Sequence, residues 1–118
     1  DGYVAVNRAF ADAVGDELER EPGAAVFFHD YHLYAAPRLV RERRPDTTIA
    51  HFTHIPWVGP EDWGVLPEPI ARAVHEGLLA ADVVGSAHPP QRRRLVALVP
   101  RVPAHLQRTR EACAALVA

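Results

Sequence analysis

The 118-residue sequence has no lysine and no methionine, and its only cysteine is Cys113. A single thiol can form neither an intrachain disulfide nor a cysteine-based zinc site, and a reducing, cytoplasmic location is the simplest expectation. No apolar run approaches the roughly 20 residues that a membrane-spanning helix needs. The first residues show no basic segment followed by an apolar one. We therefore expect neither contact with a membrane nor a signal peptide.

Motifs that define several enzyme classes are also missing. The sequence contains no G-x-G-x-x-G and no G-x-x-x-x-G-K-[ST], so neither a dinucleotide fingerprint nor a P-loop is expected. It contains no G-x-S-x-G, which disfavours a serine hydrolase, and no H-E-x-x-H, the zinc motif of metalloproteases. The missing motifs thus argue against these four kinds of enzyme site.

Charge is distributed unevenly along the chain. Residues 1–85 contain seven arginines and fourteen acidic residues, whereas residues 86–118 contain six arginines and one acidic residue. The arginine run at 92–94 has no aromatic residue within it to stack on a base, so we do not expect nucleic acid as a partner. These differences predict two parts: a folded α/β segment over 1–85 and a divergent basic, helical tail over 86–118.

Apolar spacing predicts alternating helices and strands. Tyr3, Val6, Phe10 and Val14 recur at helical spacing, which predicts a first helix. Short apolar runs bounded by turn residues predict buried strands, and amphipathic stretches between them predict further helices. In chain order we expect a helix at 2–20, a strand at 24–28, a helix at about 33–44, a strand at 47–52, a helix at about 69–80 and a strand at 83–84. This βαβαβ order predicts an α/β, Rossmann-like unit with parallel strands.

Two details of these helices can be predicted from single residues. Pro37 is unfavourable inside a helix, so it is expected in the first turn or at a kink of the helix at 33–44. In the helix at 69–80, Ile70, Val74 and Leu78 share one face.

Polar residues follow the first two predicted strands. His29 and Asp30 come at the end of the first strand, and His54 closes the stretch after the second. Ligands of open parallel sheets bind beyond the carboxyl ends of the strands, and neighbouring strands lie about 4.8 Å apart. The sequence therefore predicts that a carboxylate and several imidazoles face one crevice.

Each of these residues also has a simpler structural alternative. Asp30 can accept hydrogen bonds from sugar hydroxyls or act as a base, but it can equally cap the helix that follows it. His54 can be a loop histidine bonded to a nearby carbonyl. The pairs His29/His32 and His51/His54 leave a metal site as a minor alternative, because they straddle strand ends and do not share a helix face.

Four segments resemble one known family, the trehalose-6-phosphate synthases of glycosyltransferase family 20. Residues 27–33, FFHDYHL, resemble the family's V-H-D-Y-H-L segment, and residues 50–57, AHFTHIPW, resemble its F-x-H-I-P-F/W segment. Residues 66–85 are similar to its L-P…G-L-L-x-A-D-x-x-G stretch, and residues 3–11 to the helix that precedes the first motif. The resemblance covers about residues 2–85 and identifies them with part of the amino-terminal domain.

The resemblance implies a two-domain fold of the glycosyltransferase B type, and an enzyme that uses no metal and no cofactor. It implies transfer of glucose, with retention, from UDP-glucose or another nucleotide-glucose to glucose 6-phosphate, so a nucleotide-sugar and a sugar phosphate are the expected partners. It assigns Asp30 to the acceptor sugar and His54 with Ile55 to the donor, and makes Asp30 and His54 the catalytic residues. Tyr31 and Trp57 complete the predicted substrate contacts, with packing inside the loop as the alternative for Trp57.

Other interpretations of the sequence stay open. A pseudo-glycosyltransferase that couples cyclitols would share much the same motifs. A non-catalytic α/β domain could bind a sugar phosphate or a partner chain, and a histidine-metal protein is least favoured. After Gly85 the sequence departs from the family's G-F-H/Q-T, and either a divergent helix pair or a shifted reading frame would explain residues 86–118. Because the donor-binding half is missing from these 118 residues, we expect no activity from them alone; a homo-oligomer stays open.

Overall fold

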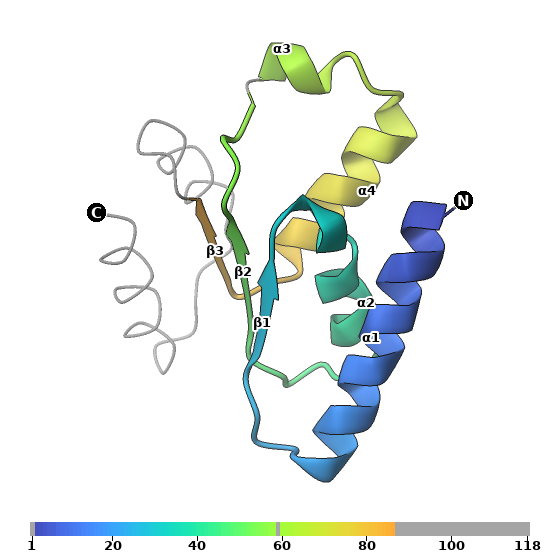
Figure 1. Ribbon diagram of the computed structural model, residues 1–118, viewed down its shortest axis with the longest axis vertical. Helices are drawn as coiled ribbons and strands as arrows, with labels where there is room; N and C mark the ends of the chain where they lie inside the picture. The colour runs from blue at the N-terminus through green and yellow to red at the C-terminus, as the bar shows by residue number, and fades with distance from the viewer. Residues whose placement is uncertain (1, 59, 87–118) are drawn as a thin grey trace.

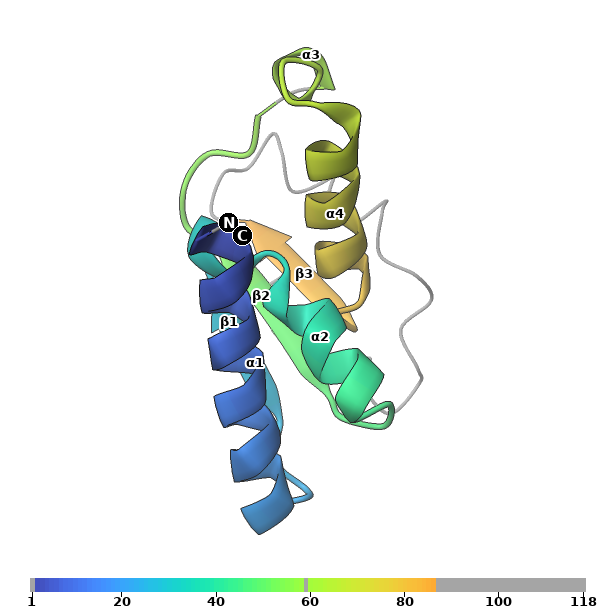
Figure 2. The same cartoon turned by 90° about the vertical axis from the view of Figure 1, so that its right-hand side faces the viewer.

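The computed structural model describes residues 2–58 and 60–86. Its elements are α1 (Gly2–Arg20), β1 (Val26–His29), the 3-10 turn η1 (Tyr31–Leu33), α2 (Ala36–Arg43), β2 (Ile49–Thr53), α3 (Pro60–Trp63), α4 (Glu68–Leu79) and β3 (Val83–Ser86). The strands form one parallel sheet in the order β1-β2-β3, with α1, α2 and α4 on one side of it (Figures 1 and 2). The predicted parallel α/β fold is confirmed. The tail predicted over 86–118 lies, except for Ser86, outside the described residues.

The core lies between the sheet and these helices. The register of the strands places Phe28, His51 and Val84 side by side, and all three are buried, as is Val40 of α2. Successive side chains of a strand point to opposite faces. Phe27, predicted to lie in a buried strand, is therefore turned away from the helices and is 51% exposed.

Helix α1 forms where it was predicted, but it buries only one end of the apolar stripe that predicted it. Val6 and Phe10 are 48% and 52% exposed, whereas Val14 is partly buried against the core. The buried side consists of Asn7, Ala11, Gly15 and Leu18. Most of these side chains are small, so α2 and the loop before it can approach α1 closely.

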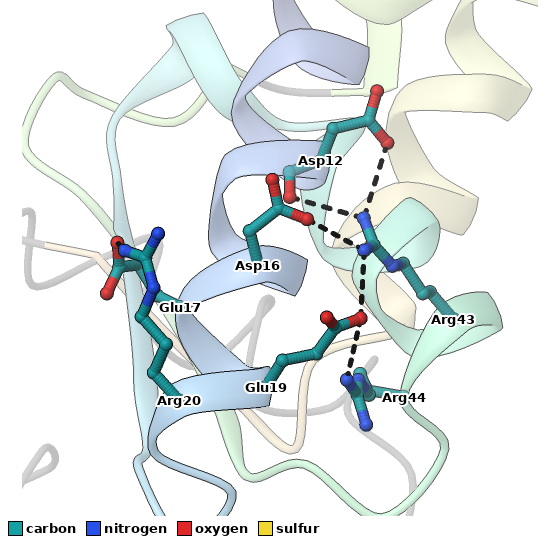
Figure 3. Close-up of polar contacts among 7 residues, drawn as sticks. All are labelled: Asp12, Asp16, Glu17, Glu19, Arg20, Arg43 and Arg44. Atoms are coloured by element: carbon teal, nitrogen blue, oxygen red, sulfur yellow. Dashed lines mark hydrogen bonds and ion pairs between the residues drawn. The ribbon is translucent and has the colours of Figure 1, made fainter.

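Surface ion pairs connect α1 to α2 (Figure 3). Arg43 donates hydrogen bonds to Asp16 at 2.8 Å and to Glu19 at 3.2 Å, and Arg44 pairs with Glu19 at 3.1 Å. These acidic side chains are largely exposed to solvent, so the pairs contribute little to the free energy of unfolding.

The remaining predicted helices and strands occur in the expected order. Pro37 lies in the first turn of α2, where its missing N–H leaves no intrahelical bond unmade. The short helix α3 was not predicted, because its four residues lie in a loop rich in glycine and proline. Ile70, predicted to share a face with Val74 and Leu78, is 51% exposed. Helix α4 buries only residues near its carboxyl end.

We expect Gly77→Ala to lower the free energy of unfolding by about 2 kcal/mol. A Cβ at Gly77 would lie 2.1 Å from the carbonyl oxygen of Tyr34 and 2.9 Å from the Cα of Ala35, and these backbone atoms cannot move aside as the end of a side chain can. Urea denaturation measures the loss. Gly23→Ala is the matched control, because a Cβ there would meet nothing within 4 Å. Equal losses in the two variants would contradict this packing.

Candidate functional site

The carboxyl ends of β1 and β2 bring the two polar segments together. Strand β1 ends at His29, which Asp30 follows, and β2 ends one residue before His54. His29 Nδ1 lies 2.9 Å from His54 Nε2, and the two rings are stacked with their centroids 5.2 Å apart. In this hydrogen bond one imidazole donates and the other accepts. Residues 25 apart in the sequence thus share one edge of the sheet.

Asp30 has a backbone conformation that amino acids other than glycine rarely adopt. Its φ is 63° and its ψ is 177°, and no other residue within 2–58 and 60–86 has a positive φ. Such a conformation costs about 1–3 kcal/mol and persists only where the surroundings hold it. Strand β2 supplies two anchors: the Asp30 N–H donates to the Phe52 carbonyl at 2.8 Å, and the Asp30 carbonyl accepts from His51 Nε2 at 3.1 Å.

The Asp30 carboxylate caps the turn that follows it. Its Oδ1 accepts a hydrogen bond from the Tyr31 N–H at 3.1 Å. One of the two carboxylate oxygens therefore acts as the cap that the sequence offered as an alternative role. In the part of the chain that the structure describes, the other oxygen accepts no hydrogen bond. Asp30 is half-buried at the rim. The carboxylate can therefore cap the turn and still offer an oxygen to a ligand.

Asn7 of α1 holds the loop at residues 30–36, here called the site loop. This side chain is fully buried. Its Oδ1 accepts from the N–H groups of Ala35 at 3.2 Å and Ala36 at 3.0 Å, and its Nδ2 donates to the His32 carbonyl at 2.9 Å. One amide thus satisfies three backbone groups of the loop that carries Asp30.

Tyr3 adds a second attachment between α1 and the site loop. Its hydroxyl donates to the Tyr31 carbonyl at 2.7 Å and accepts from the Tyr34 N–H at 3.1 Å. Burial raises the pKa of Tyr3, so the phenol keeps the proton that it donates. In the sequence, Tyr3 and Asn7 indicated only a helix. The resemblance of residues 3–11 to the helix that precedes the family's first motif was the signal that pointed to this segment.

His51 lies beneath this rim with 1% of its surface exposed. Burial lowers its pKa to about 4, the hydrogen bond to the Asp30 carbonyl opposes that shift, and His29 and His54 add to it. The imidazole is therefore neutral at pH 7. Because a carbonyl can only accept, the proton of His51 sits on Nε2, and Nδ1 is left without a partner among the described residues.

The histidines do not assemble a metal centre in the described ranges 2–58 and 60–86. No group of three or more histidine, cysteine, aspartate and glutamate side chains there could hold a metal ion. His51 belongs to the core, whereas His29 and His54 bond to each other at the surface. The pair His51/His54 is thus split between the core and the surface, whereas His29 and His32 are both exposed.

The other predicted contact residues lie in two places. Tyr31 and Ile55 are beside the rim residues in the chain and are 45% and 41% exposed. Trp57 is 6% exposed and packs against Tyr34, with ring centroids 5.9 Å apart, and against Trp63 at 5.0 Å. The structure gives the Trp57 ring a packing position, and its contact with a substrate stays a prediction.

A parallel sheet with helices packed against it, and with polar residues at the carboxyl ends of its strands, is the arrangement of a Rossmann-like α/β domain. The family model "Glycosyltransferase family 20" matches residues 1–115. The chain belongs to glycosyltransferase family 20.

Curated relatives include two kinds of transferase. A trehalose-6-phosphate synthase of Mycobacterium avium is 46% identical over 85 residues, which are 72% of this chain and 16% of the relative. A validamine 7-phosphate valienyltransferase of Streptomyces hygroscopicus subsp. jinggangensis is 38% identical over 78 residues, 66% of this chain and 16% of the relative. The chain thus spans about a sixth of the length of these relatives.

Solved structures of trehalose enzymes share the fold. An α,α-trehalose-phosphate synthase (UDP-forming) from Burkholderia vietnamiensis matches with a TM-score of 0.70 and 25% identity, over 92% of this chain and 22% of that chain. The N-terminal domain of a Candida albicans trehalose-6-phosphate phosphatase matches with a TM-score of 0.68 and 26% identity, over 81% of this chain and 20% of that chain. None of the helices within the described residues is both long and apolar enough to span a bilayer.

Proposed function

We propose that this chain contributes the acceptor side of a retaining, cytoplasmic glycosyltransferase that makes trehalose 6-phosphate from glucose 6-phosphate and a nucleotide-glucose such as UDP-glucose. The observation that carries the proposal is the shared rim, where His29 joins the segment of Asp30 to that of His54. The trehalose-6-phosphate synthases among the relatives support it. Since the chain corresponds to about a sixth of their length, we propose binding of the sugar phosphate for these residues and transfer for a protein that also carries the donor-binding part.

In this proposal the residues of the rim position substrates. The uncapped oxygen of Asp30 accepts a hydrogen bond from the acceptor sugar beside its reacting hydroxyl. His54 contacts the donor glucose, and Ile55 forms the wall next to it. The acceptor oxygen then bonds to the anomeric carbon as the bond from that carbon to the phosphate breaks, and the hydroxyl proton passes to the leaving phosphate. The protein contributes orientation and electrostatic stabilisation, and we propose no metal and no cofactor.

The acceptor role of Asp30 predicts that Asp30→Gly weakens the binding of glucose 6-phosphate about 10- to 100-fold, the effect of losing a hydrogen bond to a charged group. Glycine tolerates the positive φ of this position without strain, so the site loop should keep its path. Calorimetric titration with glucose 6-phosphate measures the affinity. Asp46→Ala is the control, because Asp46 is an exposed carboxylate that precedes β2 at the opposite end of the strand. Equal affinities of wild type and Asp30→Gly would refute this role.

A second candidate function is coupling of cyclitols by a pseudo-glycosyltransferase. The relative named validamine 7-phosphate valienyltransferase favours it. The two candidates differ in their acceptor, so parallel titrations with glucose 6-phosphate and validamine 7-phosphate separate them. Tighter binding of the aminocyclitol phosphate would favour the second candidate, and tighter binding of the glucose phosphate would favour the first.

A further inference from the structure

We propose that His51 is a positioning residue for Asp30: by donating its Nε2–H to the Asp30 carbonyl, it fixes the backbone conformation that presents the carboxylate at the rim. The effect of this positioning on substrate binding rests on the proposed function, in which Asp30 holds the acceptor sugar. The positioning itself is a property of the fold and can be tested without a substrate.

His51 is a polar residue in the core. The register puts it between Phe28 and Val84, on the side of the sheet that the helices cover, and its ring lies 5.3 Å from that of Tyr34. An apolar side chain would suit this position, and a buried polar group is unfavourable unless it is hydrogen-bonded. Within the described residues, the hydrogen bond that His51 makes is the one to Asp30.

Asp30, which receives this bond, has a strained backbone conformation. Two anchors flank the Cα of Asp30: the N–H bond to Phe52 on one side and the carbonyl bond from His51 on the other. Rotation of φ from 63° to an ordinary negative value, with the N–H still held, would turn both the carbonyl and the side chain in new directions. A fixed carbonyl therefore fixes the carboxylate. Of the two anchors, only the one from His51 is a side chain and can be removed by substitution.

The Asp30 carbonyl has one other hydrogen bond among the described residues, and that bond is long. The Asp30 oxygen also accepts from the Leu33 N–H, but at 3.4 Å, which is at the long end of such bonds. The bond from His51 is shorter, and it comes from a rigid ring packed in the core. The carbonyl of Asp30 is thus held by a side chain that is itself buried in the core.

A measurement on the wild-type chain tests the donor directly. Long-range 1H–15N NMR of the imidazoles identifies which nitrogen of each ring carries the proton. We expect a slowly exchanging proton on Nε2 of His51 at pH 7. A proton on Nδ1 would overturn the proposal, because Nε2 could then not donate to the Asp30 carbonyl. This measurement decides the matter even where a variant at position 51 does not fold.

Two variants test the consequence for Asp30. His51→Gln keeps an N–H donor near the position of Nε2, and His51→Leu keeps apolar bulk without a donor. A positive φ brings the amide proton close to the Hα of the same residue, so Asp30 should give a strong intraresidue NOE in wild type. We expect this NOE to persist in His51→Gln and to weaken in His51→Leu. Its full retention in folded His51→Leu would overturn the proposal.

Titration with glucose 6-phosphate separates this proposal from the proposed function. We expect about tenfold weaker binding in His51→Leu, recovery in His51→Gln, and no change in Val84→Ala, which removes core volume beside His51 without touching its hydrogen bond. If Asp30→Gly binds as wild type does, the acceptor role fails, while the NOE still reports whether His51 positions Asp30. If Asp30→Gly loses affinity but folded His51→Leu does not, the positioning role fails alone.

Discussion

Asn7→Ala is expected to lower the free energy of unfolding by about 4 kcal/mol and to free the site loop. The substitution leaves the His32 carbonyl and the N–H groups of Ala35 and Ala36 without their partner in a buried region. A buried group without a partner costs about 1–3 kcal/mol, and relaxation of the loop or entry of water recovers part of the sum. Urea denaturation followed by circular dichroism measures the loss, and the same variant should lose affinity for glucose 6-phosphate.

Phe10→Ala is the control for Asn7→Ala on the same helix. Phe10 is 52% exposed, so its truncation should cost less than about 1 kcal/mol, whereas truncation of a fully buried phenylalanine costs about 3–5 kcal/mol. A large loss for Phe10→Ala together with a small loss for Asn7→Ala would show that α1 faces the core through its apolar stripe. That outcome would contradict both the fold of α1 and the support of the site loop.

The orientation of α1 shows a limit of sequence reasoning. The spacing of apolar residues predicted the bounds of this helix correctly. Which of its faces is buried depends instead on which side chains let the neighbouring backbone approach. An asparagine that hydrogen-bonds three backbone groups stabilises the contact with the site loop better than a phenylalanine would, because backbone N–H and carbonyl groups need partners when they are buried. The resemblance of residues 3–11 to the family's helix pointed to this segment, whereas hydrophobic periodicity could not reveal the role of Asn7.

The sequence predicted that these polar residues meet at one edge of the sheet, but it did not predict their conformations. Parallel strands put His29 and His54 on one edge, because the carboxyl ends of such strands meet there. Nothing in an Asp-Tyr pair indicates a positive φ at Asp30, since this conformation depends on anchors from β2. Likewise, His51 and His54 are three residues apart and look alike in the sequence, yet one is in the core and the other at the surface.

The stability of the chain should fall as the pH is lowered from about 6.5 to about 4, and His51 should account for about 3 kcal/mol of that fall. Burial holds the pKa of His51 at about 4 in the folded state, against an ordinary value of 6.5. Between these values the unfolded chain binds a proton that the folded chain does not, so the free energy of unfolding rises with pH. The contribution is complete above about pH 6.5 and is lost as the pH approaches about 4.

The groups that face His51 explain why its protonation is unfavourable. Burial is the largest effect, and His29 and His54 also oppose a positive charge there, whereas the Asp30 carbonyl and carboxylate favour it too weakly to compensate. Protonation would leave the hydrogen bond from Nε2 in place and add a proton to Nδ1, which has no acceptor within the described residues. The free-energy cost of protonation therefore comes from the buried, charged imidazole, and the hydrogen bond to Asp30 is kept.

Comparison of wild type with His51→Gln isolates this contribution. Glutamine does not titrate, and every other ionisable group is common to the two chains, so the difference between their free energies of unfolding should change by about 3 kcal/mol between about pH 4 and about pH 6.5 and be constant above it. Urea denaturation at half-unit steps of pH supplies the two curves. Parallel curves would mean that His51 is protonated as readily in the folded chain as in the unfolded one, and the buried, neutral donor beneath Asp30 would then not exist.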